Sequence, residues 1–484
     1  MVWHIFRKDV KLFWKMAVGV ALLNAFRPFA PAATGHGGYA AISLLGTVLA
    51  NCLLIAAVVQ TDALASLRLD WLVRPIRRTD LLLSKLAFTV LLVQCPIFLA
   101  DVVEGLAAGL PPAPVLGAAL CRSLFMLIAV DLPALAFATL TRNLTEGLAA
   151  GLVAALCVML FLSVAQKPGQ VNFSGAAWIG LALQTACALC GAVAVACLQY
   201  FRRRTVSARW LSAATLAAAV ATQFLPFDRA FAIQESLSPM PEAAAAVQLT
   251  FEPGPWKSAM AGQADELAAL PMRFTGAGLS ERERMVEDHL AARLVEADGR
   301  TRELPQYWGY SLPFPIGRPI LGRVLLPRDL VRYLRTHSAR LEMDYSLTLE
   351  RIAAEQTLTV ESDQLVNGPQ RCVTGIDYAA QAVSVRCRAA GRVPCWHWSV
   401  EGPRFPGAYA GAEGCIADYS PRFGDFAFTD PIGSWTYSFP IAPAGASDER
   451  ADLAKTRLVV QTWEAMAHFT RHTTIPNFHL DEAQ

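Results

Sequence analysis

Charged side chains are scarce in this sequence, and their scarcity excludes several classes of protein. Asp, Glu, Lys and Arg make up only 17% of the 484 residues, whereas a soluble globular domain carries roughly 25%. Disordered chains and coiled coils carry far more charge, so both are excluded. Because 54% of the residues are hydrophobic and the mean hydropathy is +0.35, we expect lipid to solvate part of the chain. The net charge of +2 does not indicate a nucleic-acid partner.

Motifs for catalysis and for cofactor binding are also missing. The sequence has no G-x-x-x-x-G-K-[ST] loop for ATP, no H-E-x-x-H zinc motif and no G-x-S-x-G nucleophile turn. Glu464, His468 and His472 are four residues apart and would align three metal ligands on a helix, but the same residues can also be read as a strand. We therefore expect no metal, no cofactor and no catalytic activity. A membrane enzyme with an outside catalytic domain is the least favoured hypothesis.

Acidic residues are rarest in the first half of the chain. Residues 1–230 carry 18 Lys and Arg against 9 Asp and Glu, which leaves 24 against 31 for the remainder. The first part is apolar with clustered charges, and the second has the composition of a globular domain. The predicted fold class is an α-helical polytopic membrane domain over residues 14–227, followed by a mainly β extracytoplasmic domain over residues 228–484.

Seven apolar stretches of the first part are long enough to cross a bilayer as a helix, which takes about 20 residues. They lie at about 14–34, 39–62, 82–108, 114–140, 144–166, 176–200 and 207–227. A cleaved signal peptide ending near Pro31 is the competing interpretation of the first stretch, and it is disfavoured because proline makes a poor cleavage site.

Residues 1–13 are predicted to form an amphipathic helix on the cytoplasmic surface of the membrane. Five apolar side chains of the leading segment fall on one helical face: Trp3, Phe6, Val10, Phe13 and Trp14. Its basic residues lie mostly off that face, where they can meet lipid headgroups. A cationic extension of the first span is the alternative.

The basic residues alternate between the connections. They gather in four segments: Arg7, Lys8, Lys11 and Lys15; Arg68, Arg74, Arg77, Arg78 and Lys85; Arg142; and Arg202, Arg203, Arg204 and Arg209. The intervening connections are nearly free of them. Since Lys and Arg near a membrane accumulate on its cytoplasmic side, we expect a multi-pass protein of the cell (inner or plasma) membrane. Its N-terminus would lie inside and, after seven spans, residues 228–484 would lie outside.

The second part shows short runs of alternating polarity, as half-buried strands do. We expect strands at Ala246–Phe251, Arg340–Leu349, Gln356–Val360 and Gln381–Cys387. Asp298-Gly299 predicts a hairpin turn, and Pro327–Thr336 predicts a short helix. Together these features favour a β-sandwich.

Four cysteines lie in this outside part, namely Cys372, Cys387, Cys395 and Cys415. An even number on an oxidising side of the membrane indicates disulfides. Three pairings are possible, and we favour Cys372–Cys387 with Cys395–Cys415 because both are local along the chain. A four-cysteine zinc site is the alternative, but the spacings lack a close C-x₂₋₄-C pair.

Four ionisable residues fall inside predicted spans, namely Asp101, Glu104, Arg122 and Asp131. Intramembrane charges are costly and usually face a partner or a wet cavity. Because the two spans turn near residue 111, Arg122 should lie at the level of Asp101, so we expect an Asp101–Arg122 or a Glu104–Arg122 pair. Such a pair could line a transport path or simply lock the hairpin. Asp131-Leu132-Pro133 predicts a kink.

The connection after the second span is the most specific string of the chain. It reads Asp70-Trp71-Leu72-Val73-Arg74-Pro75-Ile76-Arg77-Arg78-Thr79-Asp80-Leu81-Leu82-Leu83-Ser84-Lys85. This string resembles the cytoplasmic connection of ABC-2 type transporter permeases, R-P-[IV]-x-R-x-x-[LI]-L-x-x-K. Ile5-Phe6-Arg7-Lys8-Asp9 and Thr141-Arg142-Asn143 are also similar to that family, and the resemblance covers about residues 1–200.

The resemblance implies that residues 66–85 couple the chain to a separate ATPase. The residues implied in this role are Trp71, Arg74, Pro75, Arg77, Arg78 and Lys85. Arginine suits it because its forked donors pair with acidic groups, although the positive-inside rule alone would also place arginines here. A seventh span and an outside domain depart from the family, which usually has six spans and ends in the cytoplasm.

The function implied by the resemblance is that of the permease subunit of an ATP-driven exporter. Its partners would be an ABC ATPase subunit, a second permease subunit in a homo- or heterodimer, and the lipid membrane. The alternative is a membrane-anchored extracytoplasmic binding or assembly protein without transport activity, which predicts no ATPase partner.

Overall fold

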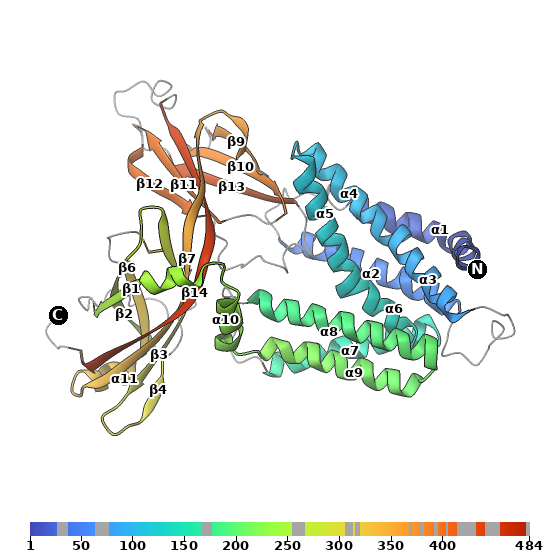
Figure 1. Cartoon of the computed structure of the whole chain (residues 1–484), viewed down its shortest axis with the longest axis horizontal. Helices are drawn as coiled ribbons and strands as arrows, with labels where there is room; N and C mark the ends of the chain where they lie inside the picture. The colour runs from blue at the N-terminus through green and yellow to red at the C-terminus, as the bar shows by residue number, and fades with distance from the viewer. Residues whose placement is uncertain are drawn as a thin grey trace.

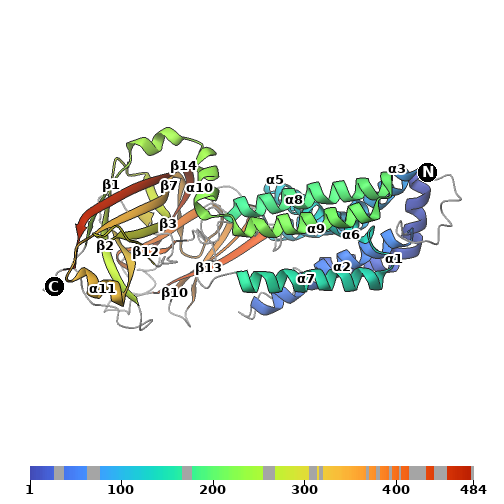
Figure 2. The ribbon, with the colours of Figure 1, turned by 90° about the horizontal axis from the view of Figure 1, so that it is seen from below.

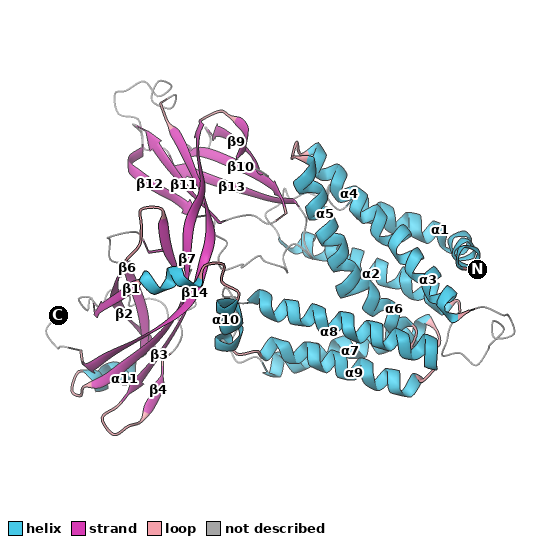
Figure 3. Ribbon diagram, in the orientation of Figure 1, coloured by secondary structure: helices cyan, strands magenta, loops and turns pink. Residues whose placement is uncertain are grey.

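The computed structural model separates the chain into a helical half and a β-rich half. It describes residues 1–484 except 27–36, 63–76, 166–176, 254–266, 305–312, 315–319, 367–369, 378–381, 392–394, 403–404, 414–431, 441–454 and 481–484. Helices fill the N-terminal half and strands dominate the C-terminal half (Figures 1 and 3). The N-terminus and the C-terminal end lie at opposite ends of the molecule (Figure 1).

The helical half contains the following elements. They are α1 (Val2–Phe26), α2 (Gly37–Gln60), α3 (Arg78–Phe88), η3 (Thr89–Gln94), α4 (Cys95–Ala107), α5 (Pro112–Met126), η4 (Leu127–Asp131), α6 (Leu132–Ala138), α7 (Leu144–Ala165), α8 (Ala177–Cys197), η5 (Leu198–Arg202), α9 (Thr205–Ala221), η6 (Thr222–Phe224) and α10 (Phe227–Ser236). Figure 2 shows α7, α8 and α9 running along this half, with the β-rich half beyond one end of them.

Three helical stretches in the described part of the chain are long and apolar enough to cross a membrane. They are Arg78–Ala107, Pro112–Ala138 and Trp178–Arg202, while Leu45–Gln60 and Leu144–Leu160 are shorter apolar helices. The expected helical half is therefore present, with three stretches that could cross a membrane among its described residues, but seven crossings are not shown.

Helix α1 runs unbroken through the boundary expected at residue 13. Phe6 packs with Val10 and Phe13 against α2 and α3, because neighbouring helices offer these side chains an apolar surface. The two tryptophans of the expected face, Trp3 and Trp14, are instead exposed. The leading segment is thus part of one packed helix, and only some of its expected apolar face is buried.

Two π-helical turns interrupt the two longest helices at matching places. The segment η3 ends at Gln94, two residues before Pro96, and η4 ends at Asp131, two residues before Pro133. A proline inside a helix lacks a donor and crowds the preceding turn, which a wider π turn relieves. The turn η4 lies where the sequence predicts a kink before Pro133.

The β-rich half holds three antiparallel sheets in its described residues. Their strands are β1 (Gln248–Pro253), β2 (Leu267–Ala277), β3 (Glu283–Val295), β4 (Thr301–Glu303), β5 (Pro313–Phe314), β6 (Ile320–Pro327), β7 (Ala339–Thr359), β8 (Asp363–Val366), β9 (Gln370–Asp377), β10 (Ala382–Ala390), β11 (Cys395–Gly402), β12 (Phe405–Glu413), β13 (Ile432–Pro440) and β14 (Arg457–Phe478). The sheet orders are β1-β2-β6, β13-β10-β9-β8 and β12-β11-β14-β7-β3-β4, with β5 beside β3.

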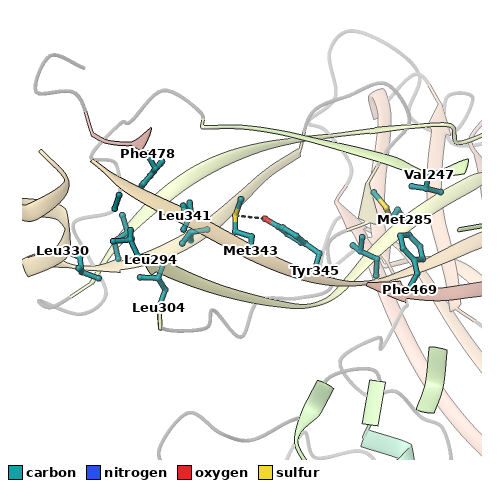
Figure 4. Close-up of a cluster of buried hydrophobic side chains, with 14 of the residues drawn as sticks. Val247, Met285, Leu294, Leu304, Leu330, Leu341, Met343, Tyr345, Phe469 and Phe478 are labelled. Carbon is teal, nitrogen blue, oxygen red and sulfur yellow. Dashed lines mark hydrogen bonds between the residues drawn. The ribbon is translucent and has the colours of Figure 1, made fainter. Parts of the chain in front are cut away.

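The two long strands β7 and β14 pair along nearly their whole length and join two lobes (Figure 1). One core lies between this ribbon, β3, β6 and the helix α11 (Arg328–Leu334), and includes Met285, Leu341 and Tyr345 (Figure 4). The other core joins the far end of the ribbon to β8–β11 and β13, around Trp398 and Phe439. The strands expected at Arg340–Leu349 and Gln356–Val360 are therefore one strand, because the ribbon serves both lobes.

Local sequence signals in this half are confirmed where the structure describes them. Asp298-Gly299 forms the β3–β4 hairpin turn, with Gly299 at a φ of 85°. The expected helix is α11. Cys372 and Cys387 face each other across β9 and β10 and form a disulfide. The second expected pair involves Cys415, which lies outside the described residues.

The β-rich half meets the helical half at the turn between α4 and α5. Leu110 of the turn and Val115 and Ala118 of α5 pack against Ala390 and Ile432. A side chain on Gly109, whose φ is 72°, would collide with Arg371 of β9. The disulfide-linked strands therefore rest on this turn.

We expect the double substitution Cys372→Ala with Cys387→Ala to destabilise the β-rich half by about 3 kcal/mol, since the bond closes a loop with a sequence separation of 15. Thermal unfolding of the purified chain measures the loss. Cys157→Ala, on α7, is the matched control and should leave the midpoint unchanged. An unchanged midpoint in the double variant would contradict a stabilising role for the bond.

Candidate functional site at the basic end of the helical half

The structure brings four basic segments of the sequence to one end of the helical half. Gln60 Nε2, at the end of α2, donates to Thr141 Oγ1 at 2.7 Å. Arg78 Nη1 donates to the carbonyl of Phe201 at 2.7 Å. Arg209 Nη2 donates to the carbonyl of Leu140 at 2.9 Å. These contacts join the ends of α2, α3, α6, η5 and α9.

Lys85 of α3 lies at the centre of this end. Its side chain is 1% exposed, and Nζ lies 2.8 Å from Asp9 Oδ2 and 2.6 Å from Asp62 Oδ2. The same ammonium donates to the carbonyl of Val58 at 2.9 Å. Lys8 reaches the other oxygen of Asp62 at 2.9 Å. Two lysines and two aspartates thus neutralise each other, and a buried charge needs such compensation. We call Lys85, Asp9 and Asp62 the lysine lock.

The lysine lock fixes both ends of the segment 63–76, whose own residues lie outside the described part of the chain. Asp62 precedes that segment, and Lys85 lies about two helical turns into α3, which begins after it. Asp9 ties both to α1. These ion pairs therefore hold α1, the end of α2 and α3 together.

The residues implied in ATPase coupling fall into different environments. Trp71, Arg74 and Pro75 lie outside the described residues. Arg77 and Arg78 are exposed at the start of α3, and Arg78 also binds η5. Lys85 is buried in the lysine lock, so it positions the connection and offers no surface to a partner.

The ion pair expected within the spans is present between Asp101 of α4 and Arg122 of α5. Both side chains are buried. The pair joins the two long helices of the hairpin below the turn that carries the β-rich half. Glu104, the other expected partner, lies one turn further along α4 and belongs to the same hairpin.

Gln94 and Asp131 form a second buried polar contact, which the sequence analysis did not pair. Gln94 Nε2 donates to Asp131 Oδ2, and the two residues end the π turns η3 and η4. Asp131 is 0% exposed. Gln94 and Asp131 each stand two residues before a proline, Pro96 and Pro133. This shared spacing was the signal in the sequence that could have paired them. Functional sites frequently contain π turns, so this contact belongs to the candidate site.

A polar cluster also lies where α10 covers the sheet. Thr348 Oγ1 donates to Asp288 and lies 2.7 Å from His468 Nδ1. Gln234 Nε2, on α10, lies 3.0 Å from the same ring nitrogen. Ser238 Oγ accepts from the backbone N–H of His468 at 2.8 Å. These contacts attach the segment after the last long helix to β7 and β14.

The spacing of Glu464, His468 and His472 does not create a metal site. All three lie on the strand β14, which separates residues four apart. Glu464 pairs with Arg351, and His472 lies 2.7 Å from Asp344. Among the described residues, no group of three or more potential ligands could hold a metal ion.

Comparisons with known proteins do not place the chain in a family. No family model matches it, and no curated protein matches it. A solved structure of red sea bream transglutaminase is similar at 13% identity and a TM-score of 0.14, over 48% of this chain and 31% of that chain. The chain thus spans about a third of that protein, and a similarity this low carries no argument about function.

We expect Lys85→Met to destabilise the helical half by roughly 3 kcal/mol, because it leaves Asp9 and Asp62 buried without their cation. Thermal unfolding in detergent measures the loss. Lys8→Met, which removes an exposed cation from the same Asp62, is the control and should cost less than about 1 kcal/mol. The combination of Lys85→Met with Asp9→Asn and Asp62→Asn should recover much of the loss. Equal effects of the two lysine substitutions would contradict the lock.

We expect stability to fall as the pH rises through the range set by Glu287. Burial, and then the neighbouring Asp288, raise the pKa of Glu287 from 4.5 to about 7. The folded chain therefore keeps a proton that the unfolded chain releases, so this contribution is complete below about pH 4.5 and lost by about pH 7. Glu287→Gln should reduce the change in the free energy of unfolding between these pH values by roughly 3 kcal/mol. An unchanged slope would contradict the shift.

Proposed function

We propose that this chain is the membrane-spanning permease subunit of an ATP-driven, ABC-2 type transporter. A separate ATPase would bind the cytoplasmic segment near residues 66–85, and a second permease subunit would complete the membrane complex. The observation that carries the proposal is the lysine lock. It ties Asp62, just before that segment, and Lys85, at its end, to Asp9 of α1. A transporter needs such a link if closure of the ATPase on ATP is to move the membrane helices.

The arrangement of charge supports the orientation in this proposal. The four basic segments meet at one end of the helical half, and the β-rich half attaches near the α4–α5 turn, away from that end (Figure 1). By the positive-inside rule the basic end is cytoplasmic. We propose seven crossings of the cell membrane, with the N-terminus inside and residues 228–484 outside.

The long helix Arg78–Ala107 offers a route between the two ends. It begins beside the lysine lock, passes through η3, and reaches the turn on which β9, β10 and β13 rest. The buried pairs Asp101–Arg122 and Gln94–Asp131 link it to its neighbour. Closure of an ATPase on the cytoplasmic side would thus move the α4–α5 turn that supports the β-rich half. In this proposal the β-rich half gates or receives an exported substrate on the outside.

Coupling is tested with the double variant Arg74→Glu and Arg77→Glu, which leaves Arg78 and its contact with Phe201 intact. The tagged chain is purified from native membranes in detergent, and the captured material is assayed for ATP hydrolysis and for a subunit with a G-x-x-x-x-G-K-[ST] motif. We expect the wild-type chain to bring an ATPase and the double variant to lose most of it, because acidic partners would then face glutamates.

Arg142→Glu is the control, since it reverses a charge at the same end but outside the coupling segment. It should retain the ATPase. A stable wild-type chain that brings no ATPase would contradict the transporter proposal and favour the alternative, a membrane-anchored extracytoplasmic binding or assembly protein. Equal capture by wild type and the double variant would contradict the assigned coupling residues.

A further inference from the structure

Two acceptor oxygens in the interior of the helical half call for a hydrogen-bond donor. Gln94 and Asp131 meet through one contact, in which Gln94 Nε2 donates to Asp131 Oδ2. The other oxygens of these two groups, Gln94 Oε1 and Asp131 Oδ1, are buried and have no partner among the residues that the structure describes. A buried acceptor without a donor costs about as much free energy as a lost hydrogen bond. Two such oxygens on one contacting pair indicate a donor shared between them.

The elements that pack most closely on the π turn η4 supply no cation to Asp131. They are η3, α2, α5, α6 and α8, and of these only α5 contains a Lys, Arg or His. That residue is Arg122, which pairs with Asp101 and lies about two and a half helical turns before Asp131. Cys52 of α2 is the titratable side chain that interacts with Asp131, and an uncharged thiol cannot neutralise a carboxylate. An ionised Asp131 would therefore stand without compensation.

Apolar side chains surround the pair. Val93 and Ile97, on either side of Gln94, and Leu135, one turn after Asp131, are all buried and belong to one hydrophobic cluster. Gln94 is 5% exposed and Asp131 is 0% exposed. A carboxylate in such surroundings is strongly disfavoured, and the group becomes neutral instead. Burial and the lack of a cation thus both favour the acid form of Asp131.

We propose that Asp131 binds a proton, taken from water, on Oδ1 and holds it against Gln94 Oε1. The carboxylic acid and the amide then form a ring of two hydrogen bonds. Gln94 Nε2 donates to Asp131 Oδ2, and Asp131 Oδ1 donates to Gln94 Oε1. One proton satisfies both oxygens and removes the uncompensated charge. The proposal requires that the helical half lies in a bilayer, and it does not depend on an ATPase partner.

The bound proton is linked to the contact between the two π turns. The turns η3 and η4 interrupt the helical stretches Arg78–Ala107 and Pro112–Ala138. The ring forms only while η3 and η4 touch, so the proton binds more tightly to the paired hairpin than to a separated one. By linkage, separation of the two stretches releases the proton, and loss of the proton favours separation. The pair is thus a proton-binding site whose occupancy reports the state of the hairpin.

The test is infrared difference spectroscopy of the full chain in phosphatidylcholine nanodiscs at neutral pH. A protonated carboxyl shows a C=O stretch that an ionised carboxylate lacks, and subtraction of the Asp131→Asn spectrum isolates the contribution of Asp131. We expect the acid band in the wild type and its loss in Asp131→Asn. Gln94→Leu should move the band, because its hydrogen bonds are removed. Asp228→Asn, at an exposed position of α10, is the matched control and should leave the band unchanged.

Thermal unfolding of the same samples tests the ring of hydrogen bonds. An asparagine amide can exchange the same two hydrogen bonds with Gln94 as the protonated acid does. We therefore expect Asp131→Asn to fold and to keep the wild-type unfolding midpoint at neutral pH. Asp131→Leu leaves the buried amide of Gln94 without a partner and should lower the midpoint by roughly 5 °C.

Three results would overturn the proposal. The first is a difference spectrum in which Asp131→Asn removes carboxylate bands and no acid band, because Asp131 would then be ionised. The second is a carboxylate band of Asp131 that changes when sodium chloride replaces choline chloride, because the site would then hold a metal cation. The third is an Asp131→Asn midpoint as low as that of Asp131→Leu, because the ring would then not form.

Discussion

The burial of one ammonium group governs the arrangement of the helical half. Lys85 has almost no contact with solvent, so it must lie between carboxylates, and Asp9 and Asp62 meet that need. These two residues come from different ends of the first two helices. Satisfying the charge therefore fixes the positions of α1, α2 and α3 relative to one another. The apolar packing of Phe6, Val58 and Phe88 around it follows from that position.

Buried ion pairs also connect the helical half to the β-rich half. Arg78–Ala107 carries Lys85 near its start and Asp101 near its end, and the turn after it supports β9, β10 and β13. A single helical stretch, widened once at η3, thus joins the basic end to the β-rich half. The disulfide between Cys372 and Cys387 cross-links β9 and β10 at the far end.

The sequence could predict what depends on local pattern. Hydrophobic runs located the long apolar helices, and alternation located β1, β7 and β10. The reflection of Arg122 onto Asp101 anticipated a real pair. The sequence could not reveal the partners of Lys85. Asp9 lies 76 residues away, and the charge of a lysine does not indicate which carboxylate it will pair with. The sequence also could not show that Phe6 and Phe13 pack on neighbouring helices within one continuous α1, because those neighbours are distant in the chain. The union of two expected strands in β7 depended on a second lobe, which has no local signal.

The central claim is that the basic end and the β-rich half lie on opposite sides of a membrane. Labelling with a membrane-impermeant thiol reagent tests it, in a background whose free cysteines in the helical half are replaced by alanine. Thr145→Cys reports the basic end and Thr357→Cys reports the ribbon, and both positions are exposed. We expect Thr357→Cys to be labelled in intact cells and Thr145→Cys only after the membrane is opened. Labelling of both from the same side would contradict the account.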